Sequence, residues 1–451
     1  MSADTTARTV SHTEGVDSVR ALQRVLYRSA KQNPDRKFHA LYDKLARSDV
    51  MWRAWADVAG NRGAPGVDGV SVDTIMASGF VGVQEFLDGL AEQLRSRTYR
   101  PLPLPLRRVH IPKPGQPGAT RPLGIPSVRD RVVMTAAKIV LEPIFEAVFL
   151  PVSFGFRPKR SAHQALEVIR VEGNRGAHFV LDADIKACFD EIDHDALMAQ
   201  VARKVSDRDV LKLLGCWLRA GVFEGGVVTD TASGTPQGSP VSPLLANIAL
   251  HVLDEAWAAM ARRPGVLVRY ADDFVVICPT RARAEQAQVL IAEIVGRLGL
   301  RLHPDKTRIA GLKGGAEGFD FLGFHHRLVG SWKRRGRWFL QRWPSNRAMA
   351  SIKAKIRART VRGRAHWPLE IVVADLNSVL RGWGEYFRYG NSSRKFAQID
   401  SYVHERLALL TSARHGRSGR NWASRYTYGW VTTIGVYRLS GTVRYLRAAH
   451  A

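Results

Sequence analysis

The feature that most constrains this chain is a short segment in which two aspartates separate two apolar runs. Residues 266–270 are rich in aliphatic and β-branched side chains, and residues 274–277 are apolar throughout. Such runs on either side of a short polar break are typical of two strands joined by a hairpin turn. The hairpin would place Asp272 and Asp273 at its tip. Alone, the pair is explained more simply as an ordinary Asp-rich turn, because aspartate favours turns for local reasons.

A second segment brings carboxylates to the end of a strand. Residues 178–184 are predicted to form a strand whose alternation puts Val180, Asp182 and Asp184 on one face. Two carboxylates with no basic residue between them are costly to desolvate unless they are solvated or bound to metal. On its own, this segment is interpreted more simply as an exposed strand end.

Together the two segments indicate a chemistry that neither indicates alone. Two-metal phosphoryl or nucleotidyl transfer needs several carboxylates that converge on a pair of Mg²⁺ ions about 3.5–4 Å apart. Mg²⁺ prefers oxygen ligands. An aspartate at a strand end, beside an aspartate pair at a hairpin tip, can supply them. The residues therefore predict metal-dependent phosphoryl transfer.

The charge balance indicates a polyanionic partner. The 451 residues include 67 Lys or Arg and 41 Asp or Glu, a net charge of +26, which is typical of nucleic-acid-binding proteins. An anionic membrane surface is the second candidate. No apolar run approaches the roughly 18 residues of a spanning helix, and the polar N-terminus lacks a signal-peptide core. The widely spaced Cys188, Cys216 and Cys278 indicate buried thiols in a reducing cytoplasm rather than a metal or disulfide framework.

The hydrophobic pattern predicts an α+β fold with a change of character near Ser331. Strands and helices alternate over residues 178–325, with Asp193 as a predicted N-cap. Residues 331–420 hold 20 Lys or Arg against 5 Asp or Glu, a net charge of +15, and five tryptophans. We predict a separate, basic, mostly helical domain there. Further helices are predicted over 83–95, 128–150, 243–260 and 284–299, and short extended pieces over 101–126.

Several motifs resemble, in order, those of reverse transcriptases. Residues 270–273 resemble the Tyr-x-Asp-Asp box, and Asp184 followed five residues later by Phe189 resembles the first catalytic palm motif. The other matching segments are 111–113 and 121–126 of the fingers, 235–247 of the template and nucleotide motif, 303–307 of the lysine motif, 319–323 of the primer grip, and 380–389 of the maturase thumb. The set covers residues 50–410. The chain is identified as a member of the bacterial group II intron reverse transcriptase/maturase family.

The resemblance also implies a subgroup. Many members carry a C-terminal DNA-binding region and a zinc-containing endonuclease. This sequence has no cysteine after Cys278, so a cysteine-bound zinc cannot form there. We therefore expect an endonuclease-less member similar to the class C intron proteins, which the ending at 435–450 also resembles.

The implied fold is a right-hand polymerase, with fingers and palm built on an antiparallel sheet and followed by a helical thumb. We expect a basic, helical N-terminal extension over residues 1–50 and the fingers and palm over 51–330. The thumb or maturase-specific domain is expected over 331–410, and a short basic tail that binds DNA or RNA over 411–451.

The resemblance assigns catalysis to Asp184, Asp272 and Asp273. These residues would hold two Mg²⁺ ions, for which Mn²⁺ substitutes, with the carbonyl of Ile185 as a further ligand. Asp182 is interpreted as a neighbour of the site rather than a ligand.

Substrate contacts are implied in the same way. Phe189 would lie against the sugar of the incoming nucleotide and exclude a 2′-hydroxyl, although a plain core role is the alternative. Lys306 would donate a proton to pyrophosphate or serve as a charge partner. The implied nucleotide-binding residues are Lys113, Arg121, Phe189, Gln237, Gly238 and Lys306, and the implied primer-grip residues are Phe321, Leu322 and Gly323.

The implied activity is RNA-directed DNA synthesis on an RNA template with a DNA primer and dNTPs. The protein would also bind intron RNA to assist splicing and target DNA for retrohoming, in the bacterial cytoplasm at the nucleoid and without a membrane. Its oligomeric state, monomer or dimer, stays open. The alternatives are a polymerase-inactive splicing maturase, which the intact aspartate triad disfavours, and a domesticated reverse transcriptase of phage defence or CRISPR adaptation, which the motif around Trp383 disfavours.

Overall fold

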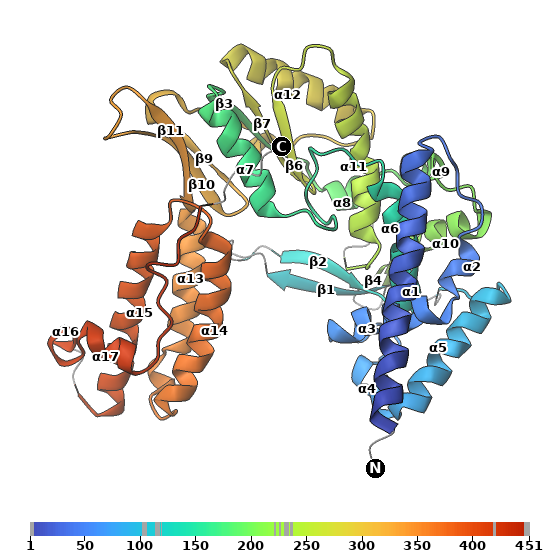
Figure 1. Cartoon of the computed structure of the whole chain (residues 1–451), viewed down its shortest axis with the longest axis horizontal. Coiled ribbons are helices and arrows are strands. Elements are labelled where there is room, and N and C mark those ends of the chain that lie inside the picture. The colour runs from blue at the N-terminus through green and yellow to red at the C-terminus, as the bar shows by residue number, and fades with distance from the viewer. Residues whose placement is uncertain are drawn as a thin grey trace.

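The chain forms three regions, and the predicted catalytic segments lie in the central one (Figure 1). The computed structural model describes residues 4–101, 106–112, 118, 120–220, 222–224, 227–229, 234, 238–417 and 421–445. Within these ranges, a helical N-terminal region lies on the right of Figure 1, a central sheet at the top, and a helical bundle at the lower left. No helix in the described ranges is both long and apolar enough to span a bilayer. The predicted α+β architecture is confirmed.

The N-terminal region is organised around helix α6 (Val128–Glu146), which is buried along nearly its whole length. Ser127 begins this helix by accepting a hydrogen bond from the backbone N–H of Asp130, as an N-cap serine does. Helices α1 (Asp4–Gln32) and α3 (Ser48–Gly60) pack on α6. The region also contains α2 (Tyr42–Leu45), α4 (Val72–Ala77), α5 (Gly79–Arg95) and a sheet in the order β2-β1-β4-β5, formed by β1 (Leu106–Pro112), β2 (Thr120–Ile125), β4 (Val222–Glu224) and β5 (Val227–Thr229).

The central sheet has four antiparallel strands in the order β6-β7-β3-β8. They are β3 (Phe179–Asp184), β6 (Val266–Tyr270), β7 (Asp273–Cys278) and β8 (Arg308–Gly311). Alternate residues of these strands face two separate cores, one shared with α11 (Ser242–Ala259) and α12 (Arg281–Gly296), the other with α7 (Ala162–Asn174). Burial on both faces explains why β6 and β7 are nearly continuous apolar runs.

The predicted elements of this region are found with small shifts at their ends. The 266–277 hairpin is confirmed as β6 and β7, and Asp193 is confirmed as an N-cap because its side chain accepts from the backbone N–H of Ala196. Helix α6 ends at Glu146, before the predicted 150. The remaining short helices are α8 (Cys188–Glu191), α9 (His194–Ala202) and α10 (Arg208–Leu218).

A three-stranded sheet in the order β11-β10-β9 joins the palm to the helical bundle. Its strands are β9 (Gly318–Phe321), β10 (Phe324–Gly330) and β11 (Trp338–Pro344). The expected domain start at 331 falls inside this sheet, in the loop between β10 and β11, because these strands pair from Phe324↔Pro344 to Gly330↔Trp338. The helices begin only at α13 (Asn346–Arg359), followed by α14 (Leu369–Phe387), α15 (Ser393–Arg414), α16 (Trp422–Arg425) and α17 (Tyr428–Thr433).

Candidate active site

Strand register brings the predicted catalytic aspartates together. In the β3–β7 pair, Asp184 lies directly opposite Asp273. In the β6–β7 pair, Tyr270 lies opposite Asp273, so only Ala271 and Asp272 form the turn. The Cα atoms of directly opposed residues in an antiparallel pair lie about 4.5–5.5 Å apart. Segments almost ninety positions apart in the sequence therefore meet at one end of the sheet, as the two carboxylate patterns predicted.

Two carboxylates of the site, Asp273 and Asp182, have a raised pKa. Burial raises the pKa of Asp273 to about 7, and the charges of Asp182, Asp184 and Asp272 add to this effect, while Lys306 opposes it. Burial also raises the pKa of Asp182 to about 6, although Arg308 lowers it in part. Crowded carboxylates are unfavourable without a compensating cation.

Two basic side chains from the β8 side partly supply that compensation. The Nζ atom of Lys306, in the short 3₁₀ helix η1 (Pro304–Lys306), lies 2.5 Å from Oδ2 of Asp184. Nε of Arg308 lies 3.4 Å from Oδ2 of Asp182. Asp182 and Asp184 are thus each paired with a basic side chain.

The carboxylate oxygens of the site are the kind of ligand that a hard divalent cation prefers, although they are not grouped closely around one point. Among the described residues, no three His, Cys, Asp or Glu side chains are grouped closely enough to hold a metal ion. Yet the oxygen donors and the raised pKa of Asp273 are what a divalent cation would compensate. Two backbone hydrogen bonds lie on either side of Ile185. Lys186 N–H donates to the Arg301 carbonyl and His303 N–H donates to the Asp184 carbonyl, so neither bond uses the Ile185 carbonyl.

Phe189 follows Asp184 through a tight connection. Ala187 takes a left-handed conformation with φ of 44° immediately before α8. Phe189 is half-buried against the N-terminal core. A Cβ added to Gly234 would lie 2.9 Å from the carbonyl oxygens of both Phe189 and Asp190, so this glycine permits a close backbone approach to α8.

The described part of the nucleotide motif packs on the fingers. Gly238 has φ of 112°, and a Cβ there would lie 2.5 Å from the carbonyl oxygen of Gly124 in β2. The absence of a side chain at Gly238 therefore permits a close backbone approach to the fingers. Gln237 and Lys113 lie outside the described residues, and only the backbone of Arg121, paired with Ile111 in β1, is described.

The predicted primer-grip residues form a two-residue turn between β9 and β10. Phe321 pairs with Phe324, and Leu322 and Gly323 between them have φ of 48° and 77°. The hydroxyl of Tyr386 in α14 donates to the Leu322 carbonyl at 2.8 Å. The thumb therefore holds this turn directly, a contact that the sequence did not reveal.

Sequence reasoning also missed Arg269, the residue just before the Tyr270 box. Its side chain is fully buried against α11. The only signal was an arginine within an otherwise apolar strand pattern, which does not by itself identify a partner.

Comparisons with known proteins identify the relatives of this chain. Residues 111–326 match the family of reverse transcriptases (RNA-dependent DNA polymerase), and residues 349–428 match the group II intron maturase-specific domain. Protein YkfC of Escherichia coli is 34% identical over 353 residues, which cover 70% of this chain and 89% of that protein.

Two further relatives are proteins of introns. Group II intron-encoded protein LtrA of Lactococcus lactis is 41% identical over 228 residues, 51% of this chain and 37% of LtrA. An uncharacterized 91 kDa protein in the cob intron of Schizosaccharomyces pombe is 29% identical over 419 residues, 77% of this chain and 49% of that protein. The matches thus span about a third and about half of these two longer proteins.

Proposed function

This chain belongs to the family of group II intron-encoded reverse transcriptases and maturases, and we propose that it synthesises DNA on an RNA template with two Mg²⁺ ions held by Asp184, Asp272 and Asp273. Reverse transcriptases generally use divalent metal ions. Bound at these carboxylates, such ions would supply activation of the primer 3′-hydroxyl and neutralisation of the triphosphate. The observation that carries the proposal is the register that sets Asp184 opposite Asp273.

Other residues of the chain would select the sugar, balance the charge of the site and support the primer. The half-buried ring of Phe189 would limit space beside the sugar and so favour deoxynucleotides. Lys306 would balance the charge of Asp184, the role that its 2.5 Å contact supports over proton donation. The turn at Leu322 and Gly323, held by Tyr386, would support the primer strand.

Primer extension on an RNA template tests this proposal. Wild-type protein with dNTPs and Mg²⁺ should extend a DNA primer, and Asp272→Ala with Asp273→Ala should abolish extension while leaving RNA binding nearly intact. Asp88→Ala, an exposed aspartate of α5, is the matched control and should extend normally. RNA binding without any dNTP incorporation by the wild type would instead favour the polymerase-inactive maturase.

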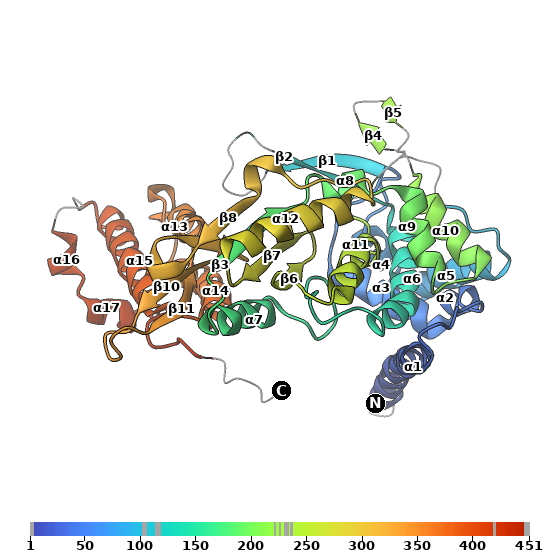
Figure 2. The same cartoon turned by 90° about the horizontal axis from the view of Figure 1, so that it is seen from above.

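A second role, binding of structured intron RNA, is supported by the loop between β10 and β11. We name residues 331–337 the basic loop. Trp332 in it is 85% exposed, and Lys333, Arg334, Arg335 and Arg337 are exposed and form no ion pair within the described part of the chain. In both views the basic loop projects away from the β1–β2 hairpin (Figures 1 and 2). Exposed cations and an exposed aromatic ring suit RNA phosphates and unstacked bases.

This second role would place the protein on nucleic acid in the bacterial cytoplasm, at the nucleoid. Splicing of the intron that encodes the chain, with and without the protein, would test the maturase role. Equal splicing rates in both cases would favour a domesticated reverse transcriptase instead.

A further inference from the structure

Arg269 is a charged side chain placed where charge is costly. It lies in β6 with no exposed surface, and its backbone is paired on both sides, with Phe274 in β7 and through a bridge to Ser153. A buried guanidinium is tolerated only when its donors have partners. The identity of those partners therefore shows what the residue does.

The partners are a carboxylate, an amide and a turn carbonyl. Nε and Nη2 donate to the two oxygens of Asp254 at 2.9 and 2.5 Å. Nη1 donates to Oδ1 of Asn247 at 3.1 Å and to the carbonyl of Ala271 at 2.9 Å. One edge of the planar guanidinium fork thus forms an ion pair with Asp254. The remaining nitrogen, Nη1, reaches the turn that contains Asp272.

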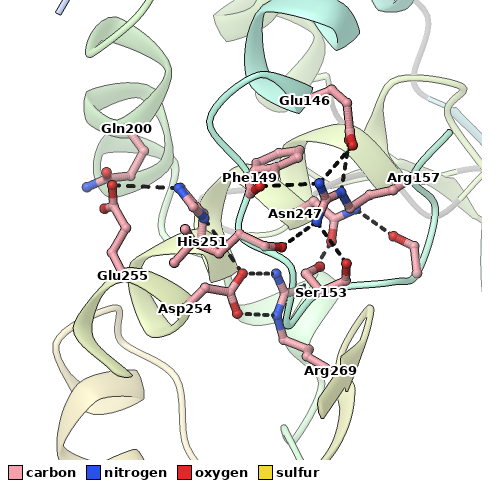
Figure 3. A network of polar contacts seen from close by, with 12 residues as sticks. Glu146, Phe149, Ser153, Arg157, Gln200, Asn247, His251, Asp254, Glu255 and Arg269 are labelled. Carbon is pink, nitrogen blue, oxygen red and sulfur yellow. Dashed lines mark hydrogen bonds and ion pairs between the residues drawn. The ribbon is translucent and has the colours of Figure 1, made fainter. Parts of the chain in front are cut away.

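Helix α11 fixes the fork in place. Asp254 and Asn247 are both buried and lie seven residues apart, about two helical turns, so they project from one face (Figure 3). Burial alone would raise the pKa of Asp254, but Arg269 and then His251 bring that pKa below its usual value. The pair is therefore ionised, and a bidentate pair fixes orientation as well as distance.

The turn is held from a second side by residues 152–155. Nδ2 of Asn247 donates to the Gly155 carbonyl at 2.9 Å. A Cβ on Gly155 would lie 2.4 Å from the backbone nitrogen of Ala271. Ala271 itself has φ of 59°, a conformation that costs a non-glycine residue about 1 kcal/mol or more. Something must hold this strained residue, and the Nη1 bond and the Gly155 contact do so.

We propose that Arg269 is a positioning residue, whose guanidinium fixes the Ala271 carbonyl and so orients the Asp272 and Asp273 carboxylates that follow it. Asp254 and Asn247 act through Arg269 by fixing its fork. This inference rests on the proposed polymerase function. The competing interpretation is an ion pair that serves folding alone.

The test removes the ion pair without leaving a buried charge. Replacing a buried pair with apolar residues of similar size is often neutral for stability, so Arg269→Leu with Asp254→Leu should stay folded, with a melting temperature lowered only by the acceptors of Asn247 and Ala271 that lose their donor. With positioning lost, kcat for primer extension should fall by about 10- to 100-fold, since a displacement of about 1 Å costs this much. The KM for dNTP should stay within about twofold of wild type, because no nucleotide contact is removed.

A matched control and a rescue separate positioning from folding. Arg342→Leu with Glu167→Leu removes another largely buried pair, 3.2 Å apart and between β11 and α7, and should leave kcat unchanged. Arg269→Lys keeps the charge but not the planar fork, so its kcat should lie between those of the wild type and the double variant.

Each outcome decides the matter. A folded double variant with wild-type kcat would overturn the inference. If that variant does not fold, Arg269→Lys decides, because wild-type kcat in it would equally reject the need for the fork. If the wild-type protein makes no DNA, the proposed polymerase function fails as well. If the wild type makes DNA and the folded double variant keeps its kcat, only the positioning role of Arg269 fails.

Discussion

The hydroxyl of Tyr386 in thumb helix α14 donates a 2.8 Å hydrogen bond to the carbonyl of Leu322 in the β9–β10 turn. Burial, with a smaller contribution from Tyr270, raises the pKa of Tyr386 to about 12. The phenol therefore stays protonated at neutral pH and keeps its donor. One side chain thus joins the thumb to the turn predicted to support the primer.

We expect Tyr386→Phe to shorten the DNA products. The lost hydrogen bond contributes about 1 kcal/mol, too little to unfold the thumb but enough to loosen the turn. Product lengths from single-round primer extension on a long RNA template measure this effect. Tyr402→Phe is the control, since that tyrosine contacts Lys353 through its ring face. Products of wild-type length from Tyr386→Phe would contradict the expectation.

Phe189→Ala should admit ribonucleotides. The half-buried ring follows Asp184 closely in the chain and is expected to crowd the sugar 2′ position. Its removal should raise the ratio of rNTP to dNTP incorporation by about tenfold or more, equivalent to about 1.4 kcal/mol of lost discrimination. Single-nucleotide incorporation kinetics measure the ratio. Phe86→Ala, a half-buried ring that packs on Trp55, should not change it, and easy rNTP use by the wild type would refute the role of Phe189.

Ala187→Gly should stabilise the protein. Ala187 has φ of 44°, where a Cβ is penalised by about 1–2 kcal/mol. Glycine removes that penalty, but its greater freedom in the unfolded chain costs about 0.4–1 kcal/mol, which leaves a gain of about 0.6–1 kcal/mol. Thermal or urea unfolding measures it. Ala282→Gly, at an exposed position in α12, should change stability in the opposite direction, by up to about 1 kcal/mol.

The predictable parts of this molecule are those that local patterns determine. Strands β3, β6 and β7 follow from apolar alternation and runs, and Asp193 follows from the preference of aspartate for N-caps. The meeting of Asp184 with Asp273 could be expected once both carboxylate segments were interpreted as parts of one site. The motif resemblance then supplied the chemistry.

The unpredicted parts depend on long-range pairing. Asp254 is a helix residue and Arg269 a strand residue, and no local signal joins them. The expected helical domain from 331 missed β11 because its tryptophans and arginines resemble a basic helix in composition. Only the pairing with β10, which places Leu340 inside and Phe339 outside, makes the segment a strand.

Wild-type stability should fall in acid partly because of His326. Burial, then Arg342 and His325, hold its pKa well below 6.5, and neither ring nitrogen has a hydrogen-bond partner among the described residues. Below about pH 6.5 the unfolded chain therefore binds a proton that the folded protein does not, so unfolding becomes easier as pH falls, by up to about 1.4 kcal/mol per pH unit.

His326→Leu should remove this component and the two unpaired polar atoms. Urea unfolding at about pH 8 and about pH 5.5 should show a smaller loss of stability in the variant than in the wild type. His39→Leu, at an exposed position, is the control and should keep the wild-type difference. An unchanged pH dependence in His326→Leu would mean that other groups account for the acid sensitivity.

The basic loop should contribute to RNA binding without contributing to DNA synthesis. Trp332→Ala should weaken binding of a bulged RNA stem-loop by about 5- to 150-fold, because stacking of one base contributes about 1–3 kcal/mol. Arg334→Ala with Arg335→Ala should reduce the slope of log affinity against log salt by about 1.4, the value for two phosphate contacts with single-stranded RNA.

Extension of a short primer–template should stay at the wild-type rate, since the loop points away from the β1–β2 hairpin (Figure 2). Phe80→Ala, which removes a 70% exposed ring stacked on Trp52 in the fingers, controls for loss of any exposed aromatic side chain. Stem-loop affinity unchanged by Trp332→Ala would exclude the loop as an RNA contact, and a loss of vesicle binding in its place would assign it to an anionic membrane surface.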